Sequence, residues 1–299
     1  MLLKISDKIS LVISELGFTY CNCLLIEDEI RTIIDTGADL ETLMNISPSS
    51  IDMVLYTHHH YDHTRGHELF NNADSLMHRL DSIAVTDIEL FEHYNSIDKW
   101  DELMPDIDRE VGIEALKILP EEQKPWNVDG CFEDGQIFDL GHTKVQVIHT
   151  PGHSAGHSSF WFPEKDFLFT GDICLTTAGP WYGEVYADPD DMISSIDKLI
   201  ELKPERIATC HVNYIYEENV TERLIEFKNR IYKRDERIFN YLKKQPADIH
   251  QLADNNLVYK YHPTPFVLFW EKLMIIKHLA RLEKMGMVEE VENSLFVAK

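Results

Sequence analysis

The chain has 299 residues, of which 44% are hydrophobic, and this size allows one large domain or a main domain with a smaller one. Its net charge of −24 excludes nucleic acid and anionic membranes as partners of the whole surface. The charge is uneven, with −27 on residues 1–221 and +3 on residues 222–299, which predicts two units with different surfaces.

The start of the chain and its cysteines bear on its location. MLLKISDKIS lacks the apolar core and the small-residue cleavage site of a signal peptide. No run approaches the roughly 18 apolar residues that a membrane span needs. The five cysteines form no CxxC pair, which is typical of reduced thiols. We therefore expect a cytoplasmic protein with no membrane partner.

The first part of the chain alternates short β-type runs with turns. KISLVISEL, YCNCLLIED and RTIIDTG are followed by DMVLYT at 52–57, which leads directly into THHHYDHTRGH at 57–67. Short apolar runs bounded by turn residues predict strands of a covered sheet. Residues 86–127 differ, because scattered apolar residues at helical spacing among many charges predict a helical insertion.

Strand-type sequence resumes after the insertion. GQIFDLG, KVQVIHTPGH, SSFWF and FLFTGD read as strands, and DPDDMISSIDKLIEL reads as a helix with Asp188 as its N-cap. KPERIATCH then predicts a last strand that ends at His211.

Beyond about residue 220 the apolar period becomes helical. One stripe consists of Leu224, Phe227, Ile231, Ile238 and Leu242, and beside it lie Arg230, Lys233, Arg234 and Arg237. PFVLFWEKLMIIKHLARLEKMG predicts a further helix that stops at Gly286, and MVEEVENSLFVAK predicts two short strands. This order outlines a winged-helix module, so we predict domains at 1–220 and 221–299. The basic side chains predict either a solvated helix face or a dock for the phosphate of RNA or coenzyme A.

The histidine-rich stretch has the residue types of a metal site. His58, His60 and Asp62 share one face of an extended segment, and His63 joins them if the chain turns there. Imidazole and carboxylate are ligands for zinc, iron or manganese. Further donors end later strand-type runs, and the whole set is His58, His60, Asp62, His63, His153, Asp172 and His211. Seven donors at strand ends suit two metals at one edge of a sheet.

Taken in order, these motifs resemble the metallo-β-lactamase superfamily. The matching segments are NCLLI (22–26), IIDTG (33–37), THHHYDH (57–63), TPGHSAGH (150–157), TGD (170–172) and His211, so the resemblance covers roughly residues 10–215. It implies an α+β fold, the αβ/βα four-layer sandwich of two mixed sheets covered by helices. It also assigns His58, His60 and His153 to one metal, Asp62, His63 and His211 to the other, and Asp172 to both.

The resemblance implies the chemistry as well. Two divalent ions, zinc first with iron or manganese as alternatives, lower the pKa of a shared water toward 7, and the resulting hydroxide attacks an acyl or phosphoryl centre. Asp62 orients the nucleophile and is the expected catalytic residue. His60 stands where the flavodiiron branch has Glu, which favours a hydrolase. Asp35 of IIDTG is expected to be buried and to fix the ligand loops.

Two positions depart from the common pattern of the superfamily. Arg65 stands where relatives often have Gly, and Cys210 precedes the last donor where relatives often have Gly. A bulkier residue at 210 could shift the second metal, which keeps a mononuclear-iron persulfide dioxygenase among the alternatives.

Other residues near the motifs have a plainer interpretation. We expect structural roles for His59, His67, His78, His149 and His157, and small buried packing for Cys174 and Cys210. Loop tyrosines are more often packing residues than donors to a substrate oxyanion, and this applies to Tyr182, Tyr186 and Tyr214.

The sequence thus predicts a two-metal hydrolase that acts on an acyl thioester of coenzyme A or glutathione, or on a related carboxylic ester. A substrate whose acyl group is attached to coenzyme A or glutathione would explain why an acidic catalytic part is joined to a mildly basic C-terminal part. Glyoxalase II also has a helical C-terminal part, and its basic residues hold the thioester substrate. A single-strand endoribonuclease is the alternative, because one subgroup with that activity carries a winged-helix appendage. A winged-helix sensor with a metal-binding body is the alternative of another class, and a homo-oligomer is left open.

Overall fold

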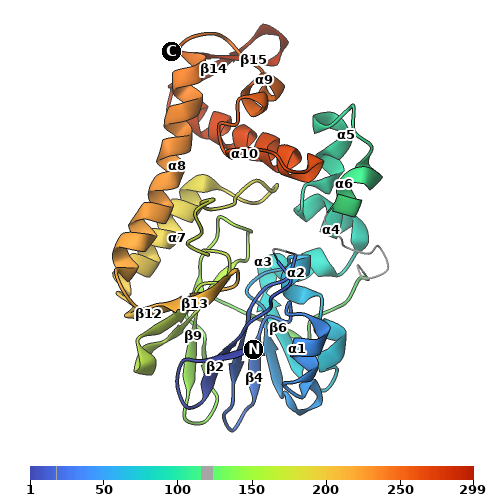
Figure 1. The fold of residues 1–299 in the computed structure, drawn as a ribbon, viewed down its shortest axis with the longest axis vertical. Coiled ribbons are helices and arrows are strands. Elements are labelled where there is room, and N and C mark those ends of the chain that lie inside the picture. The colour runs from blue at the N-terminus through green and yellow to red at the C-terminus, as the bar shows by residue number, and fades with distance from the viewer. Residues whose placement is uncertain (18, 116–123) are drawn as a thin grey trace.

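Two β-sheets form the central layers of the protein (Figure 1). The computed structural model describes residues 1–17, 19–115 and 124–299. The first sheet holds seven strands in chain order, β1 (Leu2–Lys4), β2 (Ile9–Val12), β3 (Cys23–Ile26), β4 (Thr32–Ile34), β5 (Met53–Leu55), β6 (Asp74–His78) and β7 (Gly130–Phe132). Pairing is antiparallel from β1 to β4 and parallel from β4 to β7.

The second sheet has six strands in the order β13-β12-β11-β10-β9-β8. Its members are β8 (Ile137–Asp139), β9 (Lys144–His149), β10 (Ser158–Phe162), β11 (Phe167–Phe169), β12 (Arg206–Thr209) and β13 (Val212–Tyr216). Only the β11–β12 pair is parallel. Two mixed sheets with helices outside them confirm the predicted fold class.

The main core lies between the two sheets. Leu24 and Val54 of the first sheet belong to the same buried cluster as Phe160 and Phe169 of the second. Strands β3, β4, β10 and β11 are buried along their whole length, because both faces are covered, and their sequences are therefore mostly apolar instead of alternating. The buried polar exceptions are Thr32, Ser158 and Ser159.

A second buried cluster lies on the outer side of the second sheet. Leu168 and Ile207 of that sheet pack with Ile196 of α7 (Pro189–Glu201) and with Leu224 of α8 (Val220–Leu242). Helix α7 starts at the predicted N-cap, since the Asp188 side chain accepts from the N–H groups of the first turn.

The C-terminal part contains α8, α9 (Ile249–Asp254), α10 (Pro265–Lys284), β14 (Val288–Val291) and β15 (Leu295–Ala298). All five residues of the predicted apolar stripe of α8 are buried. Gly286, with φ +71°, follows the last turn of α10 as expected. The boundary at 220 stays a prediction, and the second cluster contains residues on both sides of it. None of the described helices combines the length and the apolar character required to cross a membrane.

The insertion at 86–127 stays a prediction as a unit, and its described part is helical. It contains α4 (Ile88–Tyr94), α5 (Trp100–Leu103) and α6 (Arg109–Ala115), and residues 116–123 of the predicted range 86–127 lie outside the described residues. Trp100 and Leu103 pack against Phe266 and Phe269 of α10. The insertion therefore lies beside α10 in the upper half of the molecule, away from the lower ends of the sheets (Figure 1).

Four strands were not predicted, namely β1, β6 and β7 of the first sheet and β13 at the edge of the second. The predicted last strand ends near His211, but β13 (Val212–Tyr216) follows and pairs antiparallel with β12. The sequence of β13, VNYIY, is itself of β-type, with Asn213 and Tyr214 exposed at the sheet edge.

Candidate metal centre

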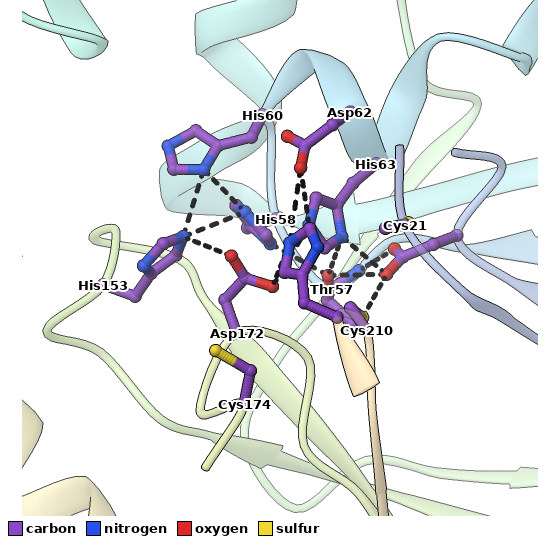
Figure 2. Close-up of polar contacts among 12 residues, drawn as sticks. Cys21, Thr57, His58, His60, Asp62, His63, His153, Asp172, Cys174 and Cys210 are labelled. Atoms are coloured by element: carbon purple, nitrogen blue, oxygen red, sulfur yellow. Dashed lines mark hydrogen bonds and ion pairs between the residues drawn. The ribbon is translucent and has the colours of Figure 1, made fainter. Parts of the chain in front are cut away.

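The predicted donors lie in segments that leave the carboxyl ends of strands. His58 follows β5, His153 follows β9, Asp172 follows β11 and His211 follows β12. The turn that brings His63 to the others is a short helix, α2 (Tyr61–Thr64), which begins directly after His60. Because these strand ends lie at one edge of the layers, four segments far apart in sequence converge there (Figures 1 and 2).

Two glycines allow this convergence. Gly152 has φ +124°, and a Cβ on it would lie 2.3 Å from the Met192 nitrogen of α7. Gly171 has φ +56°, and a Cβ on it would lie 2.6 Å from His157 Nε2. A side chain at either position would push the neighbouring donor, His153 or Asp172, out of place.

His58, His60 and His153 form the first group of donors. The nitrogens His58 Nε2 and His60 Nδ1 are 2.8 Å apart, and His153 Nε2 lies 3.1 Å from the former and 3.0 Å from the latter. Figure 2 shows the three rings pointing toward one another. Asp172 Oδ2 approaches this group, 3.4 Å from His153 Nε2.

Asp62, His63 and His211 form the second group. His211 Nε2 lies 3.3 Å from Asp62 Oδ2, and His63 Nε2 lies 3.7 Å from the same oxygen. Asp172 Oδ1 is 3.2 Å from both of these nitrogens. Asp172 therefore faces the two groups with its two oxygens, in the place expected of a shared ligand.

The chemistry of these donors fits divalent cations. A neutral imidazole has one N–H, so the three mutually close nitrogens of the first group cannot all hydrogen-bond to one another. Among the described residues, the buried atoms His63 Nε2 and Asp172 Oδ1 have no hydrogen-bond partner. Inward-pointing nitrogen and carboxylate atoms with unmet bonding capacity are what a zinc-type cation requires.

Burial sets the charge state of the first group. Burial lowers the pKa of His58 and His153 well below the ordinary histidine value, and neighbouring imidazoles lower that of His58 further. Both rings are therefore neutral near pH 7 and keep a nitrogen lone pair for a ligand. His60 differs, because the Glu184 carboxylate outweighs the effect of burial and raises its pKa.

Carboxylates dominate the second group. Burial lowers the pKa of His211, but the carboxylates of Asp172 and Asp62 overcome it and raise the pKa to about 10. Conversely, burial raises the pKa of Asp172, while His211, His63 and His153 hold it well below its usual range. The second group thus stays compact as an ion cluster.

Asp35 fixes both groups from behind, as expected. Its carboxylate is fully buried, and it accepts from Thr57 N and Thr57 Oγ1 at 2.8 Å each and from His63 Nδ1 at 2.9 Å. Its φ of +62° lies in the left-handed region, which Asp tolerates better than most residues. This conformation turns the carboxylate toward the donor loop.

His59 and Asp81 form a second buried support. His59 Nδ1 lies 3.0 Å from Asp81 Oδ2, and the His59 ring stands edge-on to that of His60 with centroids 4.8 Å apart. Asp81 also accepts from Ser154 Oγ and from Gly156 N, both at 2.5 Å. It therefore ties the His58–His60 segment to the loop that carries His153.

Replacing Asp81 with Ala is expected to destabilise the fold by about 3–5 kcal/mol, because four buried donors, including the His59 backbone N–H, lose a charged acceptor. Burial raises the pKa of this carboxyl, but His59, Ser154 and Gly156 hold it well below its usual range. Its stabilisation is therefore complete above pH ~4 and falls as the pH drops toward the folded-state pKa. In urea unfolding measured from pH 7 to pH 3, the difference in free energy of unfolding between the wild type and Asp81→Ala should become smaller as the pH falls. Asp101→Ala, at an exposed site, is the control, and a pH-independent deficit would contradict the assignment.

The remaining histidines have structural contacts. His157 Nδ1 donates to Thr150 O at 3.0 Å, and its Nε2 accepts from Asp172 N at 3.0 Å. This pairing requires a neutral ring, in agreement with burial lowering its pKa to about 4. His149 stacks on His78 with ring centroids 4.2 Å apart, and His67 stacks on Trp126 at 4.5 Å.

Tyr182 is a packing residue, since it is fully buried and its hydroxyl lies 2.9 Å from both His278 Nε2 and Arg234 Nη1. Tyr186 is half-exposed and packs on Tyr94, with ring centroids 4.7 Å apart. Tyr214 is also exposed, and its hydroxyl donates to that of Tyr216.

Arg65 and Cys210, the two positions that depart from the common pattern of the superfamily, have defined contacts in the structure. Arg65 points away from the donors, with its guanidinium 3.8 Å above the Tyr20 ring and its Nη1 donating to Thr19 O at 2.9 Å. Cys210 is buried with its Sγ 3.4 Å from Asp35 Oδ2. Neither side chain displaces His211, which lies within 3.3 Å of both carboxylates. Cys174 is half-buried, and burial raises the pKa of its thiol to about 12.

Two contacts to the first group were not expected. The segment 173–188 between β11 and α7 places Trp181 O 3.1 Å from His153 Nδ1, and places Glu184 Oε1 2.7 Å from His60 Nε2. The sequence of this segment has no ligand motif, so only its position directly after TGD could have drawn attention to it.

Comparisons with known proteins agree with this geometry. The family model described as the metallo-beta-lactamase superfamily matches residues 16–211. A beta-lactamase-like protein 2 homolog of Drosophila melanogaster is 27% identical over 267 residues, which cover 86% of this chain and 79% of the relative. A hydroxyacylglutathione hydrolase of Brucella anthropi is 25% identical over 179 residues, which cover 60% of this chain and only 54% of that enzyme. A metallo-beta-lactamase family protein of Thermus thermophilus shares the fold with a TM-score of 0.71 at 19% identity, over 99% of this chain and 100% of that one.

Proposed function

The chain belongs to the metallo-β-lactamase superfamily and is a hydrolase of that family, and from this premise we propose that it cleaves an acyl thioester or a related carboxylic ester. The observation that carries the proposal is the shared position of Asp172 between two groups of imidazole and carboxylate donors. The match to a hydroxyacylglutathione hydrolase supports a glutathione thioester as substrate class, and a coenzyme A thioester is kept as a second candidate.

The proposal assigns His58, His60 and His153 to one cation and Asp62, His63 and His211 to the other, with Asp172 on both. The convergence of ligand atoms within 4.8 Å in each group supports this assignment. Zinc is our first choice, with iron or manganese as alternatives. When bound, such ions polarise the scissile carbonyl and lower the pKa of a water molecule toward 7.

Asp62 is the proposed catalytic residue. Its side chain is 22% exposed, whereas His63 beside it is fully buried, so a substrate and a water molecule can reach the carboxylate. We propose that Asp62 Oδ2, which lies 3.3 Å from His211 Nε2, orients the attacking water and accepts its proton. Asp35 and Asp81 keep the donor loops rigid while this happens.

We propose that residues 221–299 form a winged-helix-like module docked on a catalytic domain of residues 1–220. The order α8, α9, α10, β14, β15 supports this description. Arg230 and Arg234 donate to carbonyls of the segment 173–188, which argues against a basic track for RNA along α8. Five cysteines that are all free thiols support a reducing, cytoplasmic location.

Asp62→Asn is expected to lower kcat by about 10²–10⁴-fold, because the amide cannot take a proton. The test measures the metal content of the purified protein and turnover of a panel of acyl-CoA, glutathione thioester, lactone and RNA substrates, with Asp101→Asn as the control. If Asp62→Asn turns over substrate at the wild-type rate, the proposed catalytic role of Asp62 is wrong.

The same panel separates the alternative functions. RNA cleavage with a steep salt dependence would favour an endoribonuclease. Ligand binding without turnover would favour a sensor. One iron per chain with oxygen uptake would favour a persulfide dioxygenase.

A further inference from the structure

The segment 173–188 touches the first donor group on its outer side. His58, His60 and His153 meet through the nitrogens His58 Nε2, His60 Nδ1 and His153 Nε2. The opposite nitrogen of His153, Nδ1, donates to Trp181 O at 3.1 Å. The opposite nitrogen of His60, Nε2, lies 2.7 Å from Glu184 Oε1. Two of the three imidazoles are thus contacted from behind by one segment.

Glu184 is an unusual group for such a position. The residue is only 5% exposed, and a buried carboxylate is unfavourable unless a donor faces it. His60 Nε2 is the donor-type atom that faces Oε1. Among the described residues, neither the other oxygen, Oε2, nor His60 Nε2 has a partner with hydrogen-bond geometry, so the contact between His60 and Glu184 is a short electrostatic one. The contact with His60 is therefore the interaction that stabilises the buried Glu184 carboxylate.

The C-terminal helices hold this segment in place. Arg234 of α8 donates to Ala178 O at 2.7 Å and to Pro180 O at 2.6 Å, on the N-terminal side of Trp181. Lys277 of α10 donates to Val185 O at 3.1 Å and to Ala187 O at 2.8 Å, on the C-terminal side of Glu184. These contacts fix the backbone on both sides of the two groups that reach the imidazoles.

We propose that Glu184 is a positioning residue of the first cation site and that α8 and α10 hold it there through the segment 173–188. The inference rests on the proposed function, since it concerns the same site. The Glu184 carboxylate lies 2.7 Å from His60 Nε2, and its negative charge favours the tautomer that carries the proton on Nε2 and leaves the lone pair on Nδ1. That lone pair then points at the position shared with His58 and His153. A carboxylate behind a ligating imidazole also makes the imidazole a stronger ligand.

The experiment compares Glu184→Ala and Glu184→Gln with the wild type, and Glu217→Gln, at an exposed site, is the control for a changed charge. Zinc affinity is measured by chelator competition, with His58→Ala used to identify which binding step belongs to the first site. Glu184→Ala is expected to weaken that step by about 10–100-fold. Glu184→Gln keeps a carbonyl acceptor for Nε2–H and is expected to lose less. In turnover assays of Glu184→Ala, the fold decrease in kcat should be larger than the fold change in KM.

Each outcome bears on one proposal. A wild type that binds no zinc would overturn the proposed function. A wild type that binds two ions while Glu184→Ala binds both unchanged would overturn the role of Glu184 alone. Ligand-type atoms of His59, His60 and Glu184 also lie within 4.8 Å of one another, so three ions in the wild type and two in Glu184→Ala would make Glu184 a ligand and overturn positioning. Thermal unfolding of the metal-free variants checks that each is folded.

Discussion

Asp172→Asn is expected to lower turnover by about 10³-fold or more and to reduce the cation content of the protein. Asp172 places Oδ2 3.4 Å from His153 and Oδ1 3.2 Å from both His63 and His211. The amide of Asn offers one neutral oxygen in place of two charged ones, so it cannot serve both groups. Loss of the several kcal/mol of transition-state stabilisation that a cation supplies corresponds to a factor of ten for each 1.36 kcal/mol.

The measurement is kcat/KM together with metal content after equilibration with excess zinc. Asp74→Asn, at an exposed position of β6, is the matched control and should retain both. The two-cation assignment would fail if Asp172→Asn kept two ions per chain and turned over within tenfold of the wild type. Excess zinc should restore part of the occupancy in the variant but not its kcat, because the geometry between the two groups is lost.

Arg234→Ala is expected to destabilise the protein by about 3–5 kcal/mol, the range for removing one partner of a buried charged network. Arg234 is 1% exposed and donates to Ala178 O, Pro180 O and Tyr182 Oη. The substitution leaves these three acceptors without their charged donor and opens a cavity in a close-packed region. Urea unfolding at pH 7 measures the loss.

Zinc affinity is a second measurement, and it distinguishes a role of Arg234 in holding the segment 173–188 from a general packing role. Because the segment held by Arg234 carries Trp181 and Glu184, the first zinc-binding step should also weaken in Arg234→Ala. Lys233→Ala changes a neighbouring cation on the exposed face of α8 and should leave both stability and zinc affinity unchanged. Arg234→Lys should recover little, because an ammonium is a point charge and cannot reproduce the planar fork. Unchanged zinc affinity in a destabilised Arg234→Ala would restrict Arg234 to a packing role.

Much of the candidate site could be predicted because its signals are local. His58 and His60 stand at alternating positions after a strand and meet in the first group, as predicted. The prediction was wrong for Asp62, because α2 begins at Tyr61 and turns Asp62 toward the second group. His153 and Asp172 each follow a strand end beside a glycine with positive φ. Strand ends collect at one edge of a layered fold, so the sequence could predict that the seven candidate donors lie close together; their role as metal ligands stays a prediction.

The supporting residues could not be predicted in the same way. Glu184 and Trp181 lie in an irregular segment without periodicity, so nothing near them in sequence indicates which side chain they face. The same is true of Asp81, whose partners His59 and Ser154 are 22 and 73 residues away. Such contacts arise only when distant segments are packed together.

The basic residues of α8 show where local and tertiary information divide. The sequence by itself determined most of the strands, the donor spacing and the amphipathic period of the helix, because each depends on residues within a few positions of one another. Only the tertiary structure decided that Arg234 turns inward to the segment 173–188 while Lys233 beside it stays exposed. The physical reason is that the same local sequence allows a guanidinium at the border of an apolar stripe to be either solvated or buried. It is buried when carbonyl groups of another segment face it and need a hydrogen-bond donor.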